Sequence, residues 1–237
     1  MFQYGTHGGN LFLKFFNQFK KFWILSNGMM FAELFCLKEV RGMVGKEVRL
    51  GRIFHPQSRR TVIIPLDHGV TQGPIIGLTD MRKVLEEVIE GGADAVILHR
   101  GSVPLGPWGN RKGVGLIVHL SASTTLSPAP LRKVLVCEVE EALRLGADAV
   151  SFHLNLGNPY EGEMLRELGK VAGECLRWGI PLLTMVYVRG DGVKEGRHPK
   201  WVRHAARVAA ELGADLVKVD YTGDPLSFRE VVDGCPI

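Results

Sequence analysis

A short phrase recurs three times along this chain, and each copy joins a predicted helix to a predicted strand. It reads GADAV at Gly92 and at Gly146, and GADLV at Gly213. Glycine at a helix C-terminus adopts the left-handed conformation at little cost, and the apolar run that follows is typical of a buried parallel strand. The phrase therefore predicts repeated strand–helix units.

About six such units can be traced from residue 61 onward. Strands that alternate with helices pair in parallel, and the internal similarity favours a TIM (β/α)8 barrel over an open, doubly wound sheet. No GxGxxG follows the first strand, which argues against a dinucleotide-binding fold. The predicted strands cover residues 61–66, 95–98, 116–120, 149–153, 181–187 and 213–219, and the predicted helices cover residues 79–90, 131–145, 161–178, 201–212 and 225–232.

The chain divides into residues 1–29, an N-terminal extension, and residues 30–237, an incomplete barrel. Eight units take about 250 residues, so we expect an α/β TIM barrel truncated after about six units. Aromatic residues recur at roughly helical spacing in the extension, with lysines between them. Three interpretations of this helical extension stay open: a misassigned start upstream of Met29 or Met30, a docking helix, and contact with a membrane surface.

Composition excludes several classes of protein. Hydrophobic residues make up 46% of the chain and charged residues 23%, which is ordinary for a soluble domain. The net charge of +4 is small and the basic residues are scattered, so we expect no nucleic-acid partner. The four cysteines form no CxxC pair, and free thiols in the cytoplasm are the simplest interpretation.

Polar side chains stand at the carboxyl ends of all six predicted strands. Barrel enzymes place their reactive groups at these ends, so the pattern predicts an active site there. The residues are Asp67, His68, His99, Arg100, His119, His153, Tyr187, Arg189 and Lys218.

Lys218 lies in the middle of an apolar run, DLVKVDYTGD. Burying an ammonium group is costly unless it is paired or loses its proton, and a lysine with a depressed pKa can attack a carbonyl to form a Schiff base. The alternative is an edge-strand lysine that reaches out to water. Strand alternation places Leu216, Lys218 and Asp220 on one face, and we expect that face to point into the barrel.

Asp67 and Tyr187 are the candidate proton carriers. A carboxylate near the lysine can take the substrate's hydroxyl proton when a carbon–carbon bond breaks, although Asp67 could instead cap a helix or pair with a cation. The Tyr187 hydroxyl can relay a proton, or it can bond to the backbone while the ring packs in the core.

Four histidines raise the alternative of a metal-dependent lyase or hydrolase. His68, His99, His119 and His153 could converge on one ion. No HxH or HExxH spacing is present, and the ligands would come from four separate strands. We therefore expect no metal, and expect these histidines to line the inner layer or to contact substrate.

Three segments resemble the archaeal-type class I aldolase family: VIIPLDHGVTQGPIIGL (62–78), GVGLIVHLSASTTLSP (113–128) and DLVKVDYTGD (215–224). The resemblance covers about residues 30–237. Within the family, TQGPIIGL is more similar to a synthase branch that makes 2-amino-3,7-dideoxy-D-threo-hept-6-ulosonate than to the fructose-bisphosphate aldolases.

This resemblance implies a transaldolase-type reaction. Lys218 would form a Schiff base with 6-deoxy-5-ketofructose 1-phosphate and transfer a fragment to L-aspartate semialdehyde, an early step toward 3-dehydroquinate and the aromatic amino acids. Asp67 would accept and Tyr187 donate a proton, without metal or organic cofactor, in a cytoplasmic homo-oligomer. The implied substrate-contacting residues are His68, Gly69, Val70, Thr71, Val188 and Arg189. A class I fructose-bisphosphate aldolase, or an inactive truncated remnant of either enzyme, are the alternatives.

The chain departs from the family pattern at three places. Val188 replaces a usual proline, and Val219-Asp220 replaces threonine and a small polar residue. An inward-facing Asp220 would favour the protonated form of Lys218. The family's phosphate-holding loops follow strands seven and eight, which are not recognisable here, so we expect this chain to have little or no activity.

Overall fold

The computed structural model describes residues 32–33, 43–110 and 113–237, so the helix predicted within residues 1–29 lies outside the described residues. The helices are α2 (Val44–Leu50), α3 (His68–Gln72), α4 (Met81–Glu90), η1 (Val103–Leu105), η2 (Trp108–Asn110), α5 (Val139–Arg144), α6 (Glu161–Trp178), α7 (Pro199–Glu211) and α8 (Pro225–Asp233). The strands are β1 (Ala32–Glu33), β2 (Val62–Pro65), β3 (Ala95–His99), β4 (Gly115–His119), β5 (Ser121–Ala122), β6 (Val134–Leu135), β7 (Ala149–Leu156), β8 (Leu182–Val188) and β9 (Leu216–Lys218).

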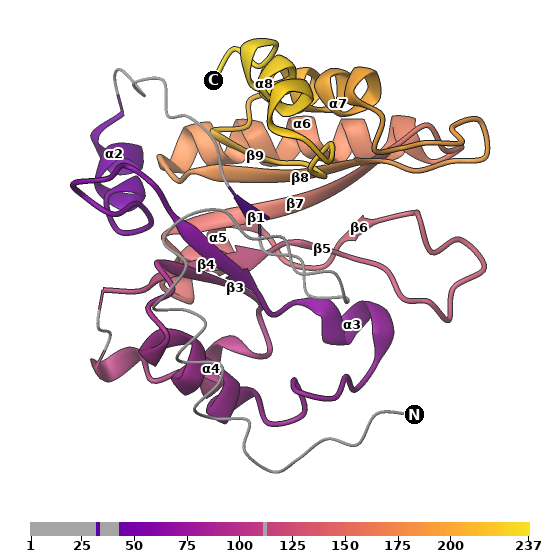
Figure 1. The fold of residues 1–237 in the computed structure, drawn as a ribbon. Coiled ribbons are helices and arrows are strands. Elements are labelled where there is room, and N and C mark those ends of the chain that lie inside the picture. The colour runs from indigo at the N-terminus through magenta and orange to yellow at the C-terminus, as the bar shows by residue number, and fades with distance from the viewer. Residues whose placement is uncertain (1–31, 34–42, 111–112) are drawn as a thin grey trace, which may run out of the picture.

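The main sheet has the order β1-β2-β3-β4-β7-β8-β9. Strands β2 to β9 of this sheet pair in parallel with their neighbours, and β1 pairs antiparallel with β2. Figure 1 shows the sheet curling into a half-barrel, with α6, α7 and α8 on its outer side. The structure thus confirms the predicted barrel-type parallel architecture.

The glycine of each repeated phrase has the backbone conformation that the sequence predicts. The φ angles are 87° at Gly92, 85° at Gly146 and 97° at Gly213. Only glycine adopts such angles without strain. Each of these glycines therefore turns the chain from the end of a helix into the next strand.

The aspartate of each repeated phrase ties its strand to the preceding strand of the sheet. One carboxylate oxygen accepts a hydrogen bond from the backbone N–H at or beside the start of that neighbour, which satisfies a donor at the rim of the sheet. The pairs are Asp94 with Val62 (2.7 Å), Asp148 with Leu116 (2.9 Å) and Asp215 with Leu182 (2.9 Å). The repeat thus encodes a recurring strand–strand clasp.

The segment around α2 closes the amino-terminal end of the half-barrel. Lys46 forms an ion pair with Asp215 at 2.7 Å, and Arg52 forms one with Asp148 at 3.0 Å. Between these clasps, Ile53 inserts into the inner core, where a methyl group on Gly115 would come within 3.0 Å of it. The same aspartates therefore anchor the strands and the segment that covers them.

Two apolar clusters lie on opposite faces of the sheet. The inner cluster combines α2 and the turn after it with inward strand residues such as Ile97, Ile117 and Leu216. The outer cluster packs helix side chains such as Leu168 against the sheet. Alternate strand residues point to opposite faces of the sheet. The inner face therefore carries apolar side chains toward the amino-terminal ends of the strands and polar side chains at their carboxyl ends.

The helix predicted over residues 131–145 is wrong in its first half. Val134 and Leu135 instead form β6, which pairs antiparallel with Ser121 and Ala122 of β5. Here β-branched and apolar residues close a short ribbon after β4, and helix α5 begins only at Val139. Strand β7 is also longer than predicted, since it continues to Leu156.

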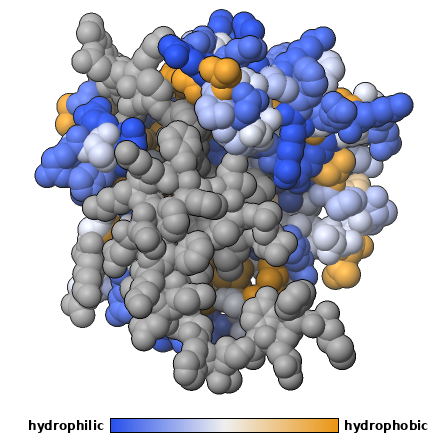
Figure 2. Space-filling view, viewed as in Figure 1, coloured by the Kyte–Doolittle hydropathy of each residue, from blue (hydrophilic) through white to orange (hydrophobic). Residues whose placement is uncertain are grey.

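On the face shown in Figure 2, the surface of the described residues is mostly hydrophilic, and hydrophobic residues form separate patches. Among the described residues, no helix has the length and apolar character needed to cross a membrane.

Candidate active site

Inward-facing polar side chains meet at the carboxyl ends of the parallel strands. The pairing register aligns His99 with His119 and Ser151 across β3, β4 and β7. It also aligns His153 with Lys218, through the intervening Met185 of β8. Parallel pairing and the two-residue period of the strands therefore bring together residues that are far apart in sequence.

Lys218 is the last residue of β9 and is only 4% exposed. Leu216, two residues earlier, belongs to the inner cluster, whereas Val217 belongs to the outer one, which confirms the predicted alternation. Burial is the main cause that holds the pKa of Lys218 below its usual value, and Arg189 acts in the same direction. The carboxylates of Asp67 and Asp220 oppose the shift.

Asp67 lies between β2 and α3, with its carboxylate among cationic and imidazole groups. One oxygen is 3.8 Å from His119 Nε2 and the other is 3.9 Å from His68 Nδ1. Burial alone would raise the pKa of Asp67, but His119, His68 and Lys218 together lower it. The side chain is thus an ionised carboxylate, as a proton acceptor has to be.

His119 connects Asp67 to the wall of the half-barrel. Its Nδ1 lies 2.7 Å from the hydroxyl of Ser151, which is fully buried. Its ring also meets His99 edge to face, with ring centres 5.2 Å apart. Burial lowers the pKa of His119 to about 4, so its imidazole is neutral at neutral pH.

Tyr187 closes the other side of the site, at the end of β8. Its ring lies 5.0 Å from His153 and 4.4 Å beneath the Arg189 guanidinium. Burial raises the pKa of the Tyr187 hydroxyl, with a further contribution from Asp220. The hydroxyl therefore keeps its proton and is available as a donor.

The remaining predicted site residues lie around this centre with different exposure. Residues 68–71 form most of α3, which has no buried residue, and Thr71 O accepts a hydrogen bond from Thr125 N at 2.9 Å. Val188 is partly buried at the end of β8, and Arg189 is exposed. Arg100 is engaged elsewhere, because it pairs with Glu141 of α5 at 2.8 Å.

Three residues of this centre were missed by the sequence reasoning. Ser151 and Asn155 continue the inward alternation of β7 on either side of His153, and that parity was the available signal. Asn155 also donates to the carbonyl of Leu131 at 2.9 Å. Lys133 was hidden inside a predicted helix, although the structure leaves it only 7% exposed, and Asp67 and Arg189 both influence its pKa.

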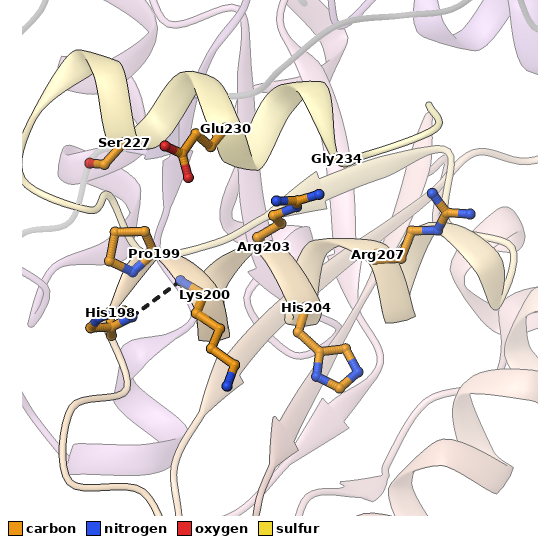
Figure 3. Close-up of a pocket in the computed structure, with 9 residues that line it drawn as sticks. All are labelled: His198, Pro199, Lys200, Arg203, His204, Arg207, Ser227, Glu230 and Gly234. Carbon is orange, nitrogen blue, oxygen red and sulfur yellow. Dashed lines mark hydrogen bonds between the residues drawn. The ribbon is translucent and has the colours of Figure 1, made fainter.

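A pocket with a volume of about 590 Å³ lies on the helix layer, between α7 and α8. Figure 3 shows Lys200, Arg203 and Arg207 along α7 on one side and Ser227 and Glu230 of α8 on the other. This depression does not contain the inward strand-end residues. Within the part of the chain that the structure describes, no group of three His, Cys, Asp or Glu side chains is spaced to hold a metal ion.

A parallel half-barrel with a buried lysine and a carboxylate at its carboxyl end is the arrangement of a Schiff-base aldolase-type enzyme. The family described as DeoC/LacD family aldolase matches residues 61–237, and the chain belongs to this family.

Two similar curated proteins carry synthase names. The 2-amino-4,5-dihydroxy-6-oxo-7-(phosphonooxy)heptanoate synthase of Streptomyces griseus is 42% identical over 194 residues, covering 81% of this chain and 70% of that protein. The 2-amino-3,7-dideoxy-D-threo-hept-6-ulosonate synthase of Halobacterium salinarum is 45% identical over 190 residues, covering 80% of this chain and 70% of its own length.

Among solved structures, an archaeal fructose-1,6-bisphosphate aldolase has a TM-score of 0.73 at 32% identity. The match covers 81% of this chain and 76% of that one. That protein is described with its catalytic lysine covalently bound to the carbinolamine intermediate of its substrate. The fold and the resemblance to the aldolase family are thereby confirmed.

Proposed function

We propose that this chain is a Schiff-base transaldolase-type synthase that transfers a fragment of 6-deoxy-5-ketofructose 1-phosphate to L-aspartate semialdehyde. The product is 2-amino-3,7-dideoxy-D-threo-hept-6-ulosonate. The observation that carries the proposal is Lys218, a buried amine with a lowered pKa at the carboxyl end of a parallel half-barrel, within the field of the Asp67 carboxylate. The synthase names of relatives at 42% and 45% identity support the choice of reaction.

Lys218 supplies the covalent chemistry. Its neutral amine attacks the keto carbon of the donor, and the carbinolamine loses water to give a protonated Schiff base. When the adjacent carbon–carbon bond breaks, its electron pair moves to the Schiff base and forms an enamine, while an aldehyde leaves. Burial favours this sequence because it raises the fraction of neutral amine at working pH.

Asp67 and Tyr187 carry the protons. Asp67 takes the hydroxyl proton of the donor as the bond breaks, and returns it to the alkoxide that forms when the enamine attacks the acceptor aldehyde. Tyr187 donates to the leaving hydroxyl of the carbinolamine, and water finally releases the product from Lys218. The lowered pKa of Asp67 and the raised pKa of Tyr187 suit an acceptor and a donor respectively.

Substrate contacts come from the rims of the same strands. His68, Gly69, Val70 and Thr71 lie on α3, directly after Asp67. Gly69 and Val70 are exposed and His68 and Thr71 are partly buried, so a ligand can reach them. Val188 and Arg189 flank the opposite side, next to the Tyr187 ring. Lys218 acts as the electron sink, so the proposed reaction uses no metal or organic cofactor.

A class I fructose-bisphosphate aldolase is the second candidate, supported by the structural similarity to an archaeal aldolase of that specificity. Product analysis separates the two. The purified chain is incubated with the keto-sugar phosphate, with and without L-aspartate semialdehyde, and products are identified by mass spectrometry. A seven-carbon amino sugar acid that forms only with the semialdehyde supports the synthase. A parallel incubation uses fructose 1,6-bisphosphate. Release of triose phosphates there, with no seven-carbon product in the first incubation, rejects the synthase and supports the aldolase.

Residues 30–237 are proposed to form the barrel domain, and residues 1–29 an extension to it. A cytoplasmic homo-oligomer in the aromatic amino acid pathway is part of the same proposal. The free state of Cys137, Cys175 and Cys235 supports a reducing compartment. Sedimentation of the purified chain tests the assembly.

A further inference from the structure

Ser151 is a polar residue on the inner face of β7 that the proposed mechanism does not use. It stands two positions before His153, so both side chains point into the half-barrel. The residue is completely buried. Among the described residues, the hydroxyl group of Ser151 has one hydrogen-bond partner, which is Nδ1 of His119 at 2.7 Å. The hydroxyl is thus committed to a single imidazole.

The direction of this hydrogen bond follows from the needs of a buried hydroxyl. Either Ser151 donates its proton to Nδ1 of His119, or a protonated Nδ1 donates to the Ser151 oxygen. In the second case the hydroxyl proton would have no acceptor within the described part of the chain, and a buried donor without an acceptor is costly. The contact therefore favours Ser151 as the donor and Nδ1 as the acceptor.

The opposite nitrogen of the ring leads independently to the same result. Nε2 of His119 lies 3.8 Å from Oδ2 of Asp67, which is too long for a hydrogen bond but close enough for a strong electrostatic interaction between buried groups. A carboxylate repels a nitrogen lone pair and attracts an N–H. Burial keeps His119 neutral by lowering its pKa to about 4, and a neutral imidazole has one N–H. That N–H is therefore on Nε2, and the lone pair on Nδ1 faces Ser151.

We infer that Ser151 is a positioning residue, which fixes the tautomer of His119 and so keeps an N–H directed at the carboxylate of Asp67. The inference rests on the proposed function, in which Asp67 accepts a proton from the donor sugar. Without the Ser151 hydroxyl, the imidazole proton can move to Nδ1, and Nε2 then turns a lone pair toward Asp67. The ionised carboxylate loses support, so its pKa rises and it accepts the substrate proton less readily in mild acid.

Other ionisable groups act on the same pair of residues. The pKa values of Asp67 and His119 also depend on His68 of α3, His99 of β3, Lys218 of β9 and Lys133. These groups all remain in a variant that lacks only the hydroxyl of Ser151. A changed titration of Asp67 in such a variant therefore reports on the hydroxyl.

The test compares the wild-type chain with two variants of this position. Ser151→Ala removes the hydroxyl, and Ser151→Cys replaces it by a thiol, which is a weaker donor. Ser121→Ala on β5 is the matched control, because Ser121 is equally buried but its hydroxyl accepts from the backbone N–H of His153 at 2.9 Å. Urea unfolding establishes that each variant is folded.

Nuclear magnetic resonance measures the tautomer in the absence of substrate. The ¹⁵N chemical shifts of the His119 ring distinguish its protonated from its unprotonated nitrogen, and the ¹³C shift of the Asp67 carboxyl group follows its titration. We expect the Nε2–H tautomer in wild type and in Ser121→Ala. Ser151→Ala should populate the Nδ1–H tautomer and raise the pKa of Asp67, and Ser151→Cys should lie between them.

Kinetics provide the second measurement. In Ser151→Ala, the ratio of the donor-cleavage rate at pH 5 to that at pH 8 should fall by about two-fold or more relative to Ser121→Ala. The pH profile of borohydride trapping, which follows Lys218, should be the same in both variants. A merely structural role of Ser151 would instead move both profiles or neither.

The inference is overturned if wild type carries the proton on Nδ1 of His119, or if Ser151→Ala keeps the wild-type tautomer and the wild-type titration of Asp67. If Ser151→Ala does not fold, the same two readings on wild type and Ser151→Cys decide. A wild-type chain that shows neither trapping nor cleavage would reject the proposed function. The resonance measurements on Asp67 and His119 would still decide whether Ser151 fixes the tautomer.

Discussion

The imidazole of His119 is held between the hydroxyl of Ser151, 2.7 Å from its Nδ1, and the carboxylate of Asp67, 3.8 Å from its Nε2. Both distances connect segments that are separated in sequence, and both lie at the buried end of the candidate active site. A neutral imidazole that accepts from Ser151 presents its N–H toward Asp67 and thereby favours the ionised carboxylate. The carboxylate that we propose as the proton acceptor is thus supported from the wall of the half-barrel.

This arrangement predicts a loss of stability in mild acid. The pKa of His119 is about 4 in the folded chain, compared with 6.5 ordinarily, so the unfolded chain binds a proton that the folded one refuses. The contribution of His119 to the free energy of unfolding is fully present well above pH 6.5 and is lost as the pH falls toward 4. For His119 alone this loss is about 3 kcal/mol. His153, whose pKa burial also lowers, adds to the loss.

Urea unfolding at pH 7.5 and pH 5 measures this effect. His119→Gln should reduce the difference in unfolding free energy between the two pH values. Replacing the exposed His204 of α7 by Gln is the control and should leave the difference as in wild type. If His119→Gln showed the same difference in unfolding free energy as wild type, the conclusion that His119 is buried in its neutral form would be contradicted.

Asp67→Asn should separate Schiff-base formation from bond cleavage. The substitution removes the proposed proton acceptor, so we expect cleavage to slow by about 10²–10⁴-fold. It also removes a carboxylate that raises the pKa of Lys218, so the neutral amine becomes more abundant and trapping with borohydride should persist. Rapid-quench assays of aldehyde release measure the cleavage rate, and the yield of borohydride trapping measures Schiff-base formation. Asp191→Asn on an exposed loop is the control, and normal cleavage by Asp67→Asn would rule out the assigned role.

Tyr187→Phe should lower turnover by about 10²-fold with little change in stability, because the ring contacts to His153 and Arg189 are kept. Since the pKa of Tyr187 is raised, its ionisation should not appear in the rate below pH 10. Steady-state rates across pH test both statements. Tyr160→Phe, outside the site, is the matched control, and equal rates for the two variants would exclude a proton-donating hydroxyl.

Gly115→Ala tests the closure of the half-barrel by the segment around α2. The added methyl group would lie 3.0 Å from Ile53 and 3.2 Å from the carbonyl of Arg52, so we expect a loss of about 1–3 kcal/mol in unfolding free energy. Gly169→Ala on α6 meets no atom within 4 Å, and should instead stabilise by about 0.5–1 kcal/mol. Urea denaturation compares them, and equal effects would contradict the close contact.

Sequence patterns predicted the parallel architecture because its signals are local. Helix α6 agrees with its predicted bounds at both ends, since apolar spacing defines its body and Gly179 ends it in the left-handed conformation. Strand alternation likewise predicted the inward direction of Lys218. The features that could not be predicted depend on pairing between distant segments, because β6 forms only where β5 lies beside it.

The central claim is that Lys218 is the Schiff-base residue, and borohydride trapping with a keto-sugar phosphate tests it most directly. We predict one reduced adduct on the tryptic peptide 208–229, because modification of Lys218 prevents cleavage there. The rate of adduct formation should rise with pH and reach its plateau at a pH below the ordinary lysine pKa of about 10.4. Lys218→Met should give no adduct. A folded wild-type chain that gives no adduct, or one at another lysine, would contradict the account.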